Sequence, residues 1–268
     1  MADNHLYAIS CFTLNLAMQA GEIMSRERSH ATLEHSYKNN EELVTNADIK
    51  VDQFISKQLK RNFPDHIIVS EEENPDLARM AITDQPMWIV DPIDGTVNYA
   101  HGQFHSAVSI AYVEQGEVKV GVVHCPFLNE TFSAIKGVHS VMNHKPIHVS
   151  DTTALDKALI ATGFPYHKED TGMLTNRLSK VLANCQDIRR LGSAAMDICW
   201  VAMGRLDGYY ESLKPWDFAA ARLVAAEAGA VCGHFSAVPE GIPAELFGDD
   251  IIIANPHIYE PLRSLLVD

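Results

Sequence analysis

The sequence predicts a mixed α/β fold, and three patterns along the chain support this prediction. Apolar residues recur with helical spacing over residues 5–28 and again over 46–63. Short apolar runs, typical of buried strands, occupy 67–69 and 88–90. The second half then alternates candidate strands and helices between 158 and 253. Interleaved elements of both types indicate helices packed on sheets in an α/β architecture.

The N-terminal part begins with the amphipathic helix over 5–28. A polar stretch, 29–42, follows it and is expected to form a loop or a short hairpin. Thr45 and Asp48 lie at the start of the second helix, where cap-type residues satisfy free backbone N–H groups. The apolar spacing of this helix continues to Phe63.

The strands of the first half follow from short apolar runs and from alternation. One strand is predicted at 67–69, and a second at 88–90 is expected to break at Asp91-Pro92, since proline lacks a backbone donor. Further strands are predicted within 105–125, on both sides of a turn at 114–117, and at 131–135.

A polar, turn-rich stretch over 143–152 is the predicted boundary between two parts of the chain, 1–150 and 151–268. Four strands and three helices are expected beyond it. The strands are predicted near 158–161, 187–188, 206–210 and 251–253, and the helices at 171–183, 193–203 and 216–228.

The charge balance excludes one class of function. The chain has 21 Lys and Arg against 35 Asp and Glu, a formal net charge of −14 at pH 7. A protein whose main ligand is nucleic acid needs a basic footprint, which is absent here. The excess of carboxylates is compatible with divalent metal sites, and equally with an acidic surface alone.

Cysteine usage and the N-terminus predict a cytoplasmic protein. The five cysteines are odd in number and form no C-x-x-C pair, so neither a disulfide framework nor a zinc site is expected. The N-terminus lacks the basic region of a signal peptide, and no apolar run approaches the roughly 20 residues that span a bilayer. The thirteen histidines are scattered, without the spacing of a transition-metal site.

The segment 88–96 carries the strongest chemical signal. A buried strand delivers two carboxylates, Asp91 and Asp94, at its end, and Ile93 between them offers a backbone carbonyl. Gly95 allows the backbone to approach a ligand closely. Oxygen-only groups without nearby His or Cys suit Mg²⁺ or Mn²⁺. The alternative is a chemically idle Asp-Pro-x-Asp-Gly surface turn.

Two further acidic elements also stand at the ends of predicted elements. Glu71 and Glu72 follow the strand at 67–70, and Asp217 lies beside Trp216 at a helix start. Taken singly, they fit a solvated charge cluster and a helix cap. Taken together with Asp91, they predict acidic residues from three distant stretches that converge on one crevice.

These motifs resemble a known family. The segment 91–99 resembles the first signature of the inositol monophosphatase family, and the acidic pair at 71–72 matches the pair that precedes it. The stretches 216–221 and 226–230 resemble the second signature. The elements follow family order along nearly the whole chain. The resemblance implies a layered α/β/α/β/α sandwich of the inositol monophosphatase and fructose-1,6-bisphosphatase type.

The resemblance implies two or three bound Mg²⁺ ions, with Mn²⁺ as a substitute. The implied ligands are Glu71, Asp91 and the Ile93 carbonyl for one ion, and Asp91, Asp94 and Asp217 for another. Glu71 would help to hold a third, weaker ion. The first part of the chain then supplies most ligands, and the second supplies Asp217 and the substrate pocket.

The same resemblance implies roles in catalysis. Backbone N–H groups of Gly95 and Thr96 would receive the phosphate, and Asp48 would accept a hydrogen bond from Thr96, whose hydroxyl orients the attacking water. Glu72 and Lys38 are accessory candidates. Metal ions neutralise the phosphate, lower the pKa of bound water and stabilise the leaving oxygen.

The alcohol half of the substrate is predicted from the second part of the chain. Ser193 and Ala194 resemble the segment that lines the inositol pocket, and Glu211 the glutamate that accepts hydrogen bonds from ring hydroxyls. The predicted reaction converts myo-inositol monophosphate to inositol and phosphate. Glu211 as a merely exposed residue is the alternative. Related phosphatases act on fructose 1,6-bisphosphate, histidinol phosphate, adenosine 3′,5′-bisphosphate or nicotinamide dinucleotide phosphates.

The resemblance also implies a homodimer and inhibition by Li⁺. Some bacterial members join transcription antitermination complexes, which makes a regulatory binding protein the competing class of function. Arg189-Arg190 is the only basic pair in the relevant region, so a protein partner in a transcription complex fits better than intrinsic RNA binding.

Overall fold

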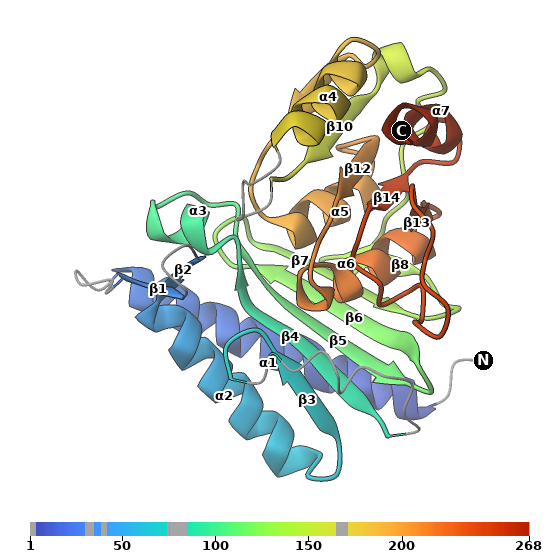
Figure 1. Cartoon of the computed structure of the whole chain (residues 1–268). Coiled ribbons are helices and arrows are strands. Elements are labelled where there is room, and N and C mark those ends of the chain that lie inside the picture. The colour runs from blue at the N-terminus through green and yellow to red at the C-terminus, as the bar shows by residue number, and fades with distance from the viewer. Residues whose placement is uncertain are drawn as a thin grey trace.

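The computed structural model describes residues 4–29, 35–38, 42–73, 75, 85–164 and 171–267. Two long helices, α1 (Asn4–Ser29) and α2 (Asn46–Asn62), pack together on one face of the largest sheet (Figure 1). Buried residues recur along α2 every four positions, at Val51, Ile55 and Leu59, so the helix turns one apolar stripe toward the sheet.

The large sheet has seven strands in the order β3-β4-β5-β6-β7-β8-β9. Strands β3 and β4 are parallel, and the other neighbours are antiparallel. The strands are β3 (Ile67–Ser70), β4 (Met87–Asp94), β5 (Ala107–Glu114), β6 (Glu117–Cys125), β7 (Glu130–Ile135), β8 (Ser140–Met142) and β9 (Lys145–Pro146). A separate antiparallel pair, β1 (His35–Lys38) and β2 (Glu42–Thr45), lies between the first two helices in sequence.

The second sheet has five strands in the order β11-β10-β12-β14-β13. Strand β10 is parallel to both of its neighbours, whereas β14 is antiparallel to both of its own. The strands are β10 (Leu159–Thr162), β11 (Asp187–Arg189), β12 (Gly208–Glu211), β13 (Val231–His234) and β14 (Ile251–Ala254).

The remaining helices complete the layers. Helices α5 (Ala194–Ala202) and α6 (Pro215–Glu227) contact strands of both sheets. Helices α4 (Thr171–Leu182) and α7 (Tyr259–Leu266) pack together on the outer side of the second sheet, at the top of Figure 1. Short helices occupy Thr96–Ala100 (α3) and Leu155–Lys157. The layers therefore run α/β/α/β/α, and the predicted fold class is confirmed.

Strand β4 contributes side chains to two hydrophobic cores. Trp88 and Val90 belong to the cluster under α1 and α2, whereas Met87 and Ile89 belong to the cluster shared with α5 and α6. Side chains alternate between the faces of a strand, so a strand covered on both sides reads as an unbroken apolar run. This double burial explains why 88–90 stands out in the sequence.

The predicted break of this strand at Asp91-Pro92 is wrong. Strand β4 continues to Asp94, with a register shift against β5 between Asp91 and Asp94. A proline removes only one donor, and an irregularity in the pairing accommodates that loss. The short elements α3, β8, β9 and β13 and the terminal helix α7 were not predicted. The boundary near 143–152 stays a prediction.

Candidate active site

The parallel pairing of β3 and β4 brings the first two acidic elements together. Ser70 pairs with Val90, and the Glu71 N–H donates to the Val90 carbonyl at 3.2 Å. Glu71 therefore follows the end of β3 at the level where β4 presents Asp91. Two stretches about twenty residues apart in sequence meet here because parallel strands end at the same edge of a sheet.

Helix α6 brings the third acidic element to the same place. Ser109 on β5 pairs with Asp91, and its hydroxyl donates to the Trp216 carbonyl at 3.1 Å. Asp217 follows, and its carboxylate accepts the Lys214 N–H at 2.8 Å as a cap of the helix. As a result, carboxylate oxygens of Asp91, Asp94 and Asp217 lie within 4.8 Å of one another.

This cluster concentrates negative charge in a buried place. Asp91 is 1% exposed and Asp94 is 7% exposed. Burial raises the pKa of Asp91 well above its usual range, and the neighbouring charges of Glu71, Asp94 and Asp217 raise it further. Carboxylates that repel one another in a desolvated site favour either protonation or a bound cation.

The donor set fits Mg²⁺ or Mn²⁺. It consists of carboxylate oxygens, which these hard cations prefer. Oxygens on opposite sides of one Mg²⁺ ion lie about 4 Å apart, close to the 4.8 Å span of the cluster. Paired ions in two-metal sites are also about 3.5–4 Å apart. Among the described residues, this cluster is the only group of carboxylates, histidines or cysteines with metal-binding geometry.

Helix α5 holds Asp94 in place. The Asp94 carboxylate accepts hydrogen bonds from the Ser193 hydroxyl at 2.5 Å, the Ala195 N–H at 2.8 Å and the Ala194 N–H at 3.3 Å. Burial still raises the pKa of Asp94 to about 6, against the lowering effect of these donors. Ser193 and Ala194, predicted to line the substrate pocket, thus contact Asp94; their contact with substrate stays a prediction.

We expect Ser193→Ala to raise the Mg²⁺ concentration for half-maximal activity about tenfold, because a residue that orients a metal ligand typically contributes that much to metal affinity. Ser193→Thr keeps a hydroxyl and should therefore need a Mg²⁺ concentration close to that of the parent. Ser264→Ala, which changes a serine on the exposed side of α7, serves as the control. Mg²⁺ titration of the predicted phosphatase activity measures the effect. An unchanged Mg²⁺ requirement in Ser193→Ala would show that the hydroxyl does not position Asp94.

Thr96 and Asp48 form a second buried network. The Thr96 hydroxyl lies 2.9 Å from Asp48 Oδ1 and 3.0 Å from the Ile93 carbonyl oxygen. The other oxygen, Asp48 Oδ2, accepts from both the N–H and the hydroxyl of Thr45, the residue that caps α2. Because a hydroxyl has one proton, Thr96 donates to one of its two partners at a time. Burial raises the pKa of Asp48.

Because Thr96 is predicted to orient the attacking water, removal of its hydroxyl should lower kcat about a hundredfold or more, the usual contribution of a group that takes part in proton transfer. Thr96→Val keeps the shape of the side chain, and Thr96→Ser keeps the hydroxyl. We expect activity near that of the parent in the serine variant alone. Steady-state kinetics at saturating Mg²⁺ measures the difference, and comparable activity in both variants would refute the role.

Gly95 connects β4 to α3 in a conformation that favours glycine. Its φ is +87°, in the left-handed region. A Cβ at this position would lie 3.0 Å from both the Gly192 and the His105 carbonyl oxygens. The turn is therefore packed against the loops that contain Gly192 and His105, with little room for a side chain at Gly95.

Glu211 is the last residue of β12. Its carboxylate accepts a hydrogen bond from the Tyr209 hydroxyl, and burial raises its pKa to about 7. Glu72 is half-buried beside Glu71. Lys38 belongs to β1, but its side chain lies outside the described residues.

Sequence reasoning missed several residues that support the site. Asp52 accepts from the Ser70 hydroxyl at 2.7 Å and from the Glu73 N–H at 2.9 Å, so α2 holds the turn that carries Glu71. Its spacing of four from Asp48 places both on one face of α2, a signal that could have revealed it. Asn98 donates to the Leu191 carbonyl at 2.7 Å, which ties α3 to the loop before α5.

The comparisons with known proteins agree with this arrangement. The family model described as the inositol monophosphatase family matches residues 6–265. The protein named Nus factor SuhB of Salmonella typhimurium is 33% identical over 267 residues, which cover 98% of this chain and 97% of that protein. Inositol monophosphatase 3 of Solanum lycopersicum is 37% identical over 254 residues, with 93% of both chains covered. The resemblance drawn from the motifs is confirmed.

Solved structures show the same fold. The crystal structure of the extragenic suppressor protein suhB from Bartonella henselae has a TM-score of 0.86 and 34% identity, and 97% of this chain and 98% of that chain are covered. The IMPase of Thermotoga maritima has a TM-score of 0.82 and 31% identity, with 95% of both chains covered. No helix among the described residues is long and apolar enough to cross a membrane.

Proposed function

This chain belongs to the inositol monophosphatase family, and on that premise we propose that it hydrolyses the phosphate monoester of a small polyol with the help of Mg²⁺. Family membership supports phosphatase activity and metal binding. The best single candidate for the substrate is myo-inositol monophosphate. The observation that carries the proposal is the cluster of the buried Asp91 and Asp94 with the half-buried Asp217, from segments more than 100 residues apart.

In this proposal Glu71, Asp91, Asp94, Asp217 and the Ile93 carbonyl hold the metal ions. Bound Mg²⁺ would neutralise the phosphate and lower the pKa of a coordinated water. The protein contributes the fixed positions of these oxygens. Helix α5 restrains Asp94, the capped start of α6 restrains Asp217, and the β3–β4 pairing restrains Glu71.

Thr96 and Asp48 orient the attacking water in this proposal. The hydroxyl of Thr96 can pass its proton toward Asp48 while it accepts one from the water, since their oxygens are 2.9 Å apart. The N–H groups of Gly95 and Thr96 would bind the phosphate oxygens. Thr45 keeps Asp48 facing Thr96 through two hydrogen bonds to its other oxygen.

The direct test is a panel of substrates with and without Mg²⁺. It contains inositol monophosphate, fructose 1,6-bisphosphate, histidinol phosphate, adenosine 3′,5′-bisphosphate and a nicotinamide dinucleotide phosphate. We expect Mg²⁺-dependent phosphate release that is fastest from inositol monophosphate. Faster release from another member of the panel would reassign the substrate, and no release from any ester would contradict phosphatase activity.

Glu211 is proposed to select the polyol by accepting hydrogen bonds from its hydroxyls. We expect Glu211→Ala to lower kcat/KM for inositol monophosphate by more than about tenfold relative to p-nitrophenyl phosphate, which has no such hydroxyl. Glu260→Ala, an exposed glutamate on α7, is the matched control. Equal losses on the two esters would remove Glu211 from substrate recognition.

Three properties of the family extend the proposal. We propose that the chain forms a homodimer, acts in the cytoplasm and is inhibited by Li⁺ through displacement of a weakly held Mg²⁺. Analytical ultracentrifugation, cell fractionation and Li⁺ titration of activity test them separately. Resistance to high Li⁺ would count against the third without touching phosphatase activity.

A second candidate function is supported by the names of relatives. Several bacterial proteins at 33–36% identity are named Nus factor SuhB, so we propose a protein-binding role in a transcription complex as the alternative. The net charge of −14 argues against RNA binding by the chain alone. A cellular phenotype that the Asp94→Asn variant rescues fully would favour this role, and failure of rescue would favour the enzyme.

A further inference from the structure

Helix α5 supplies the donors that hold Asp94. The Ser193 hydroxyl and the N–H groups of Ala194 and Ala195 belong to its N-terminal end. The first N–H groups of a helix have no acceptor within the helix, so these two N–H groups depend on Asp94 for a partner. Whatever fixes the start of α5 therefore also fixes a carboxylate of the candidate metal cluster.

A further contact joins the start of α5 to the chain that follows Asp94. His105, in the loop between α3 and β5, has its Nε2 atom 2.9 Å from Asp197 Oδ1. The Asp197 N–H donates to the Ser193 carbonyl at 3.0 Å, so Asp197 closes the first turn of α5. Because an ionised carboxylate only accepts hydrogen bonds, Nε2 of His105 is the donor.

This pair is buried. The side chains of His105 and Asp197 are 11% and 2% exposed, and the neighbours of Asp197 on the helix, Met196 and Ile198, are buried and apolar. Burial raises the pKa of Asp197, whereas the hydrogen bond from His105 and the charge of Arg190 oppose that rise. A carboxylate in such surroundings is costly unless it is hydrogen-bonded. The two segments are therefore held together by a contact that Asp197 needs.

His105 is itself fixed at both its backbone and its ring. Its carbonyl accepts the side-chain amide of Asn98 at 2.8 Å, and the same amide donates to the Leu191 carbonyl. Its ring meets the Trp200 ring edge to face, with 4.8 Å between the centroids. Asp197 and Trp200 are three positions apart, so they lie on one face of α5. The imidazole is therefore a rigid link between the loop after α3 and this face of the helix.

We propose that His105 and Asp197 are positioning residues of the metal centre. Their hydrogen bond keeps the start of α5 against the segment that begins at Asp94, so that the three donors of the helix are directed at this carboxylate before a cation binds. This inference rests on the proposed metal-dependent function and adds two residues to it.

Substitution on either side of the pair should weaken metal binding in the absence of substrate. His105→Phe keeps a ring beside Trp200 and removes the donor, whereas Asp197→Ala removes the acceptor and leaves no buried charge. We expect each variant to raise the Kd for Mn²⁺ about tenfold, the lower end of the usual effect of a group behind a metal ligand. Electron paramagnetic resonance of free Mn²⁺ measures the Kd. Asp197→Ala carries the test if His105→Phe does not fold.

Two further variants show whether the pair acts as a unit. His105→Gln places an amide donor near the position of Nε2, so it should bind Mn²⁺ within about twofold of the parent. The double variant of His105→Phe and Asp197→Ala should lose no more affinity than either single variant, because both changes remove the same interaction. Unchanged affinity in the single variants, or losses that multiply in the double variant, would overturn the proposal.

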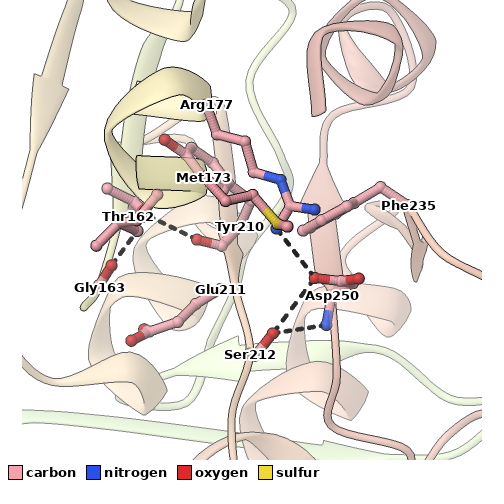
Figure 2. A pocket seen from close by; sticks show the side chains of 10 residues that line it. Thr162, Gly163, Met173, Arg177, Tyr210, Glu211, Ser212, Phe235 and Asp250 are labelled. Atoms are coloured by element: carbon pink, nitrogen blue, oxygen red, sulfur yellow. Dashed lines mark hydrogen bonds and ion pairs between the residues drawn. The ribbon is translucent and has the colours of Figure 1, made fainter. Parts of the chain in front are cut away.

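The cavity between α4 and the second sheet provides a control for loss of stability. Its volume is about 310 Å³, and Tyr210 and Phe235 belong to its walls (Figure 2). None of the described residues that line it belongs to the metal cluster or donates a hydrogen bond to Asp94. Phe235→Leu should lower the Tm, because Phe235 is buried, and leave the Kd for Mn²⁺ unchanged. A rise in that Kd would show that instability alone weakens the site, and would overturn the proposal.

A measurement without metal separates this inference from the proposed function. Hydrogen exchange of the Ala195 N–H, followed by NMR, reports whether Asp94 still accepts its hydrogen bond. We expect exchange about tenfold faster in His105→Phe than in the parent or in His105→Gln, since a weakened contact opens more often. If the parent binds no Mn²⁺ but this difference appears, the metal-dependent function fails and the positioning of Asp94 stands. If the parent binds Mn²⁺ and His105→Phe changes neither the Kd nor the exchange, the positioning role fails alone.

Discussion

Asp94→Asn should lower kcat at least about a thousandfold while the protein stays folded. A metal ion supplies several kcal/mol of stabilisation to the transition state, and each 1.4 kcal/mol or so is a factor of ten in rate. Asp94 is one of the three carboxylates of the candidate metal cluster, and a neutral amide is a poor ligand for Mg²⁺. The fold should survive because the amide oxygen can still accept from Ser193 and Ala195.

Phosphate release at saturating substrate and Mg²⁺, with circular dichroism and a thermal melt on the same samples, measures both halves of this prediction. Asp156→Asn is the matched control, since its carboxylate is 70% exposed and far from the cluster in sequence. Near-parental turnover in a folded Asp94→Asn variant would contradict the assignment of Asp94 to the metal site. Loss of turnover in the control would make the effect nonspecific.

Removal of charge from the cluster should stabilise the metal-free protein and abolish its response to Mg²⁺. Asp91 is buried among carboxylates, and each neighbouring charge disfavours its ionised form. Asp91→Asn keeps the acceptor for the Ile93 N–H and removes the charge. We therefore expect the metal-free variant to melt at a higher temperature than the metal-free parent at neutral pH.

Mg²⁺ should stabilise the parent protein far more than the Asp91→Asn variant. A ligand at 100 times its Kd stabilises the folded state by about 2.7 kcal/mol, which corresponds to a rise in Tm of about 5 °C or more for a chain of this size. The parent should show this rise and the Asp91→Asn variant should lose most of it. Differential scanning calorimetry with EDTA or excess Mg²⁺ measures both. A variant that melts lower than the parent without metal, and rises as much with Mg²⁺, would refute electrostatic strain in the cluster.

The features with a strong local pattern could be predicted from the sequence. The apolar run before Asp91 is buried on both faces of β4, so it is recognisable without any partner. The helix of α2 carries a capping box at Thr45 and Asp48, which marks its start. The signature residues around Asp91 and Asp217 identify the family, and the fold follows from the family rather than from periodicity.

Contacts between distant segments could not be predicted in this way. The hydrogen bond from Ser109 to the Trp216 carbonyl joins β5 to α6, and that from Asn98 to the Leu191 carbonyl joins α3 to the loop before α5. The sequence pattern around Ser109 and Asn98 gives no indication of which distant residues their side chains contact. Ser193 illustrates the same limit, since only the structure shows its hydroxyl directed at Asp94.

Short or irregular elements could not be predicted for a related reason. Helix α3 has five residues, too few for a helical repeat to register. Strand β4 passes through Pro92 because its pairing with β5 shifts there, a compensation that depends on the partner strand. Helix α7 buries Tyr259, Leu262 and Leu266 on one face, so its pattern was present but lay in a short stretch near the end of the chain.

The central claim is that carboxylates from three separate stretches of the chain converge to hold divalent cations. Anomalous diffraction from crystals of the protein soaked in Mn²⁺ tests it most directly. We predict a strong anomalous peak between the carboxylates of Asp91, Asp94 and Asp217, and its loss in Asp94→Asn crystals. An empty cluster, with Mn²⁺ bound only elsewhere on the molecule, would contradict the account.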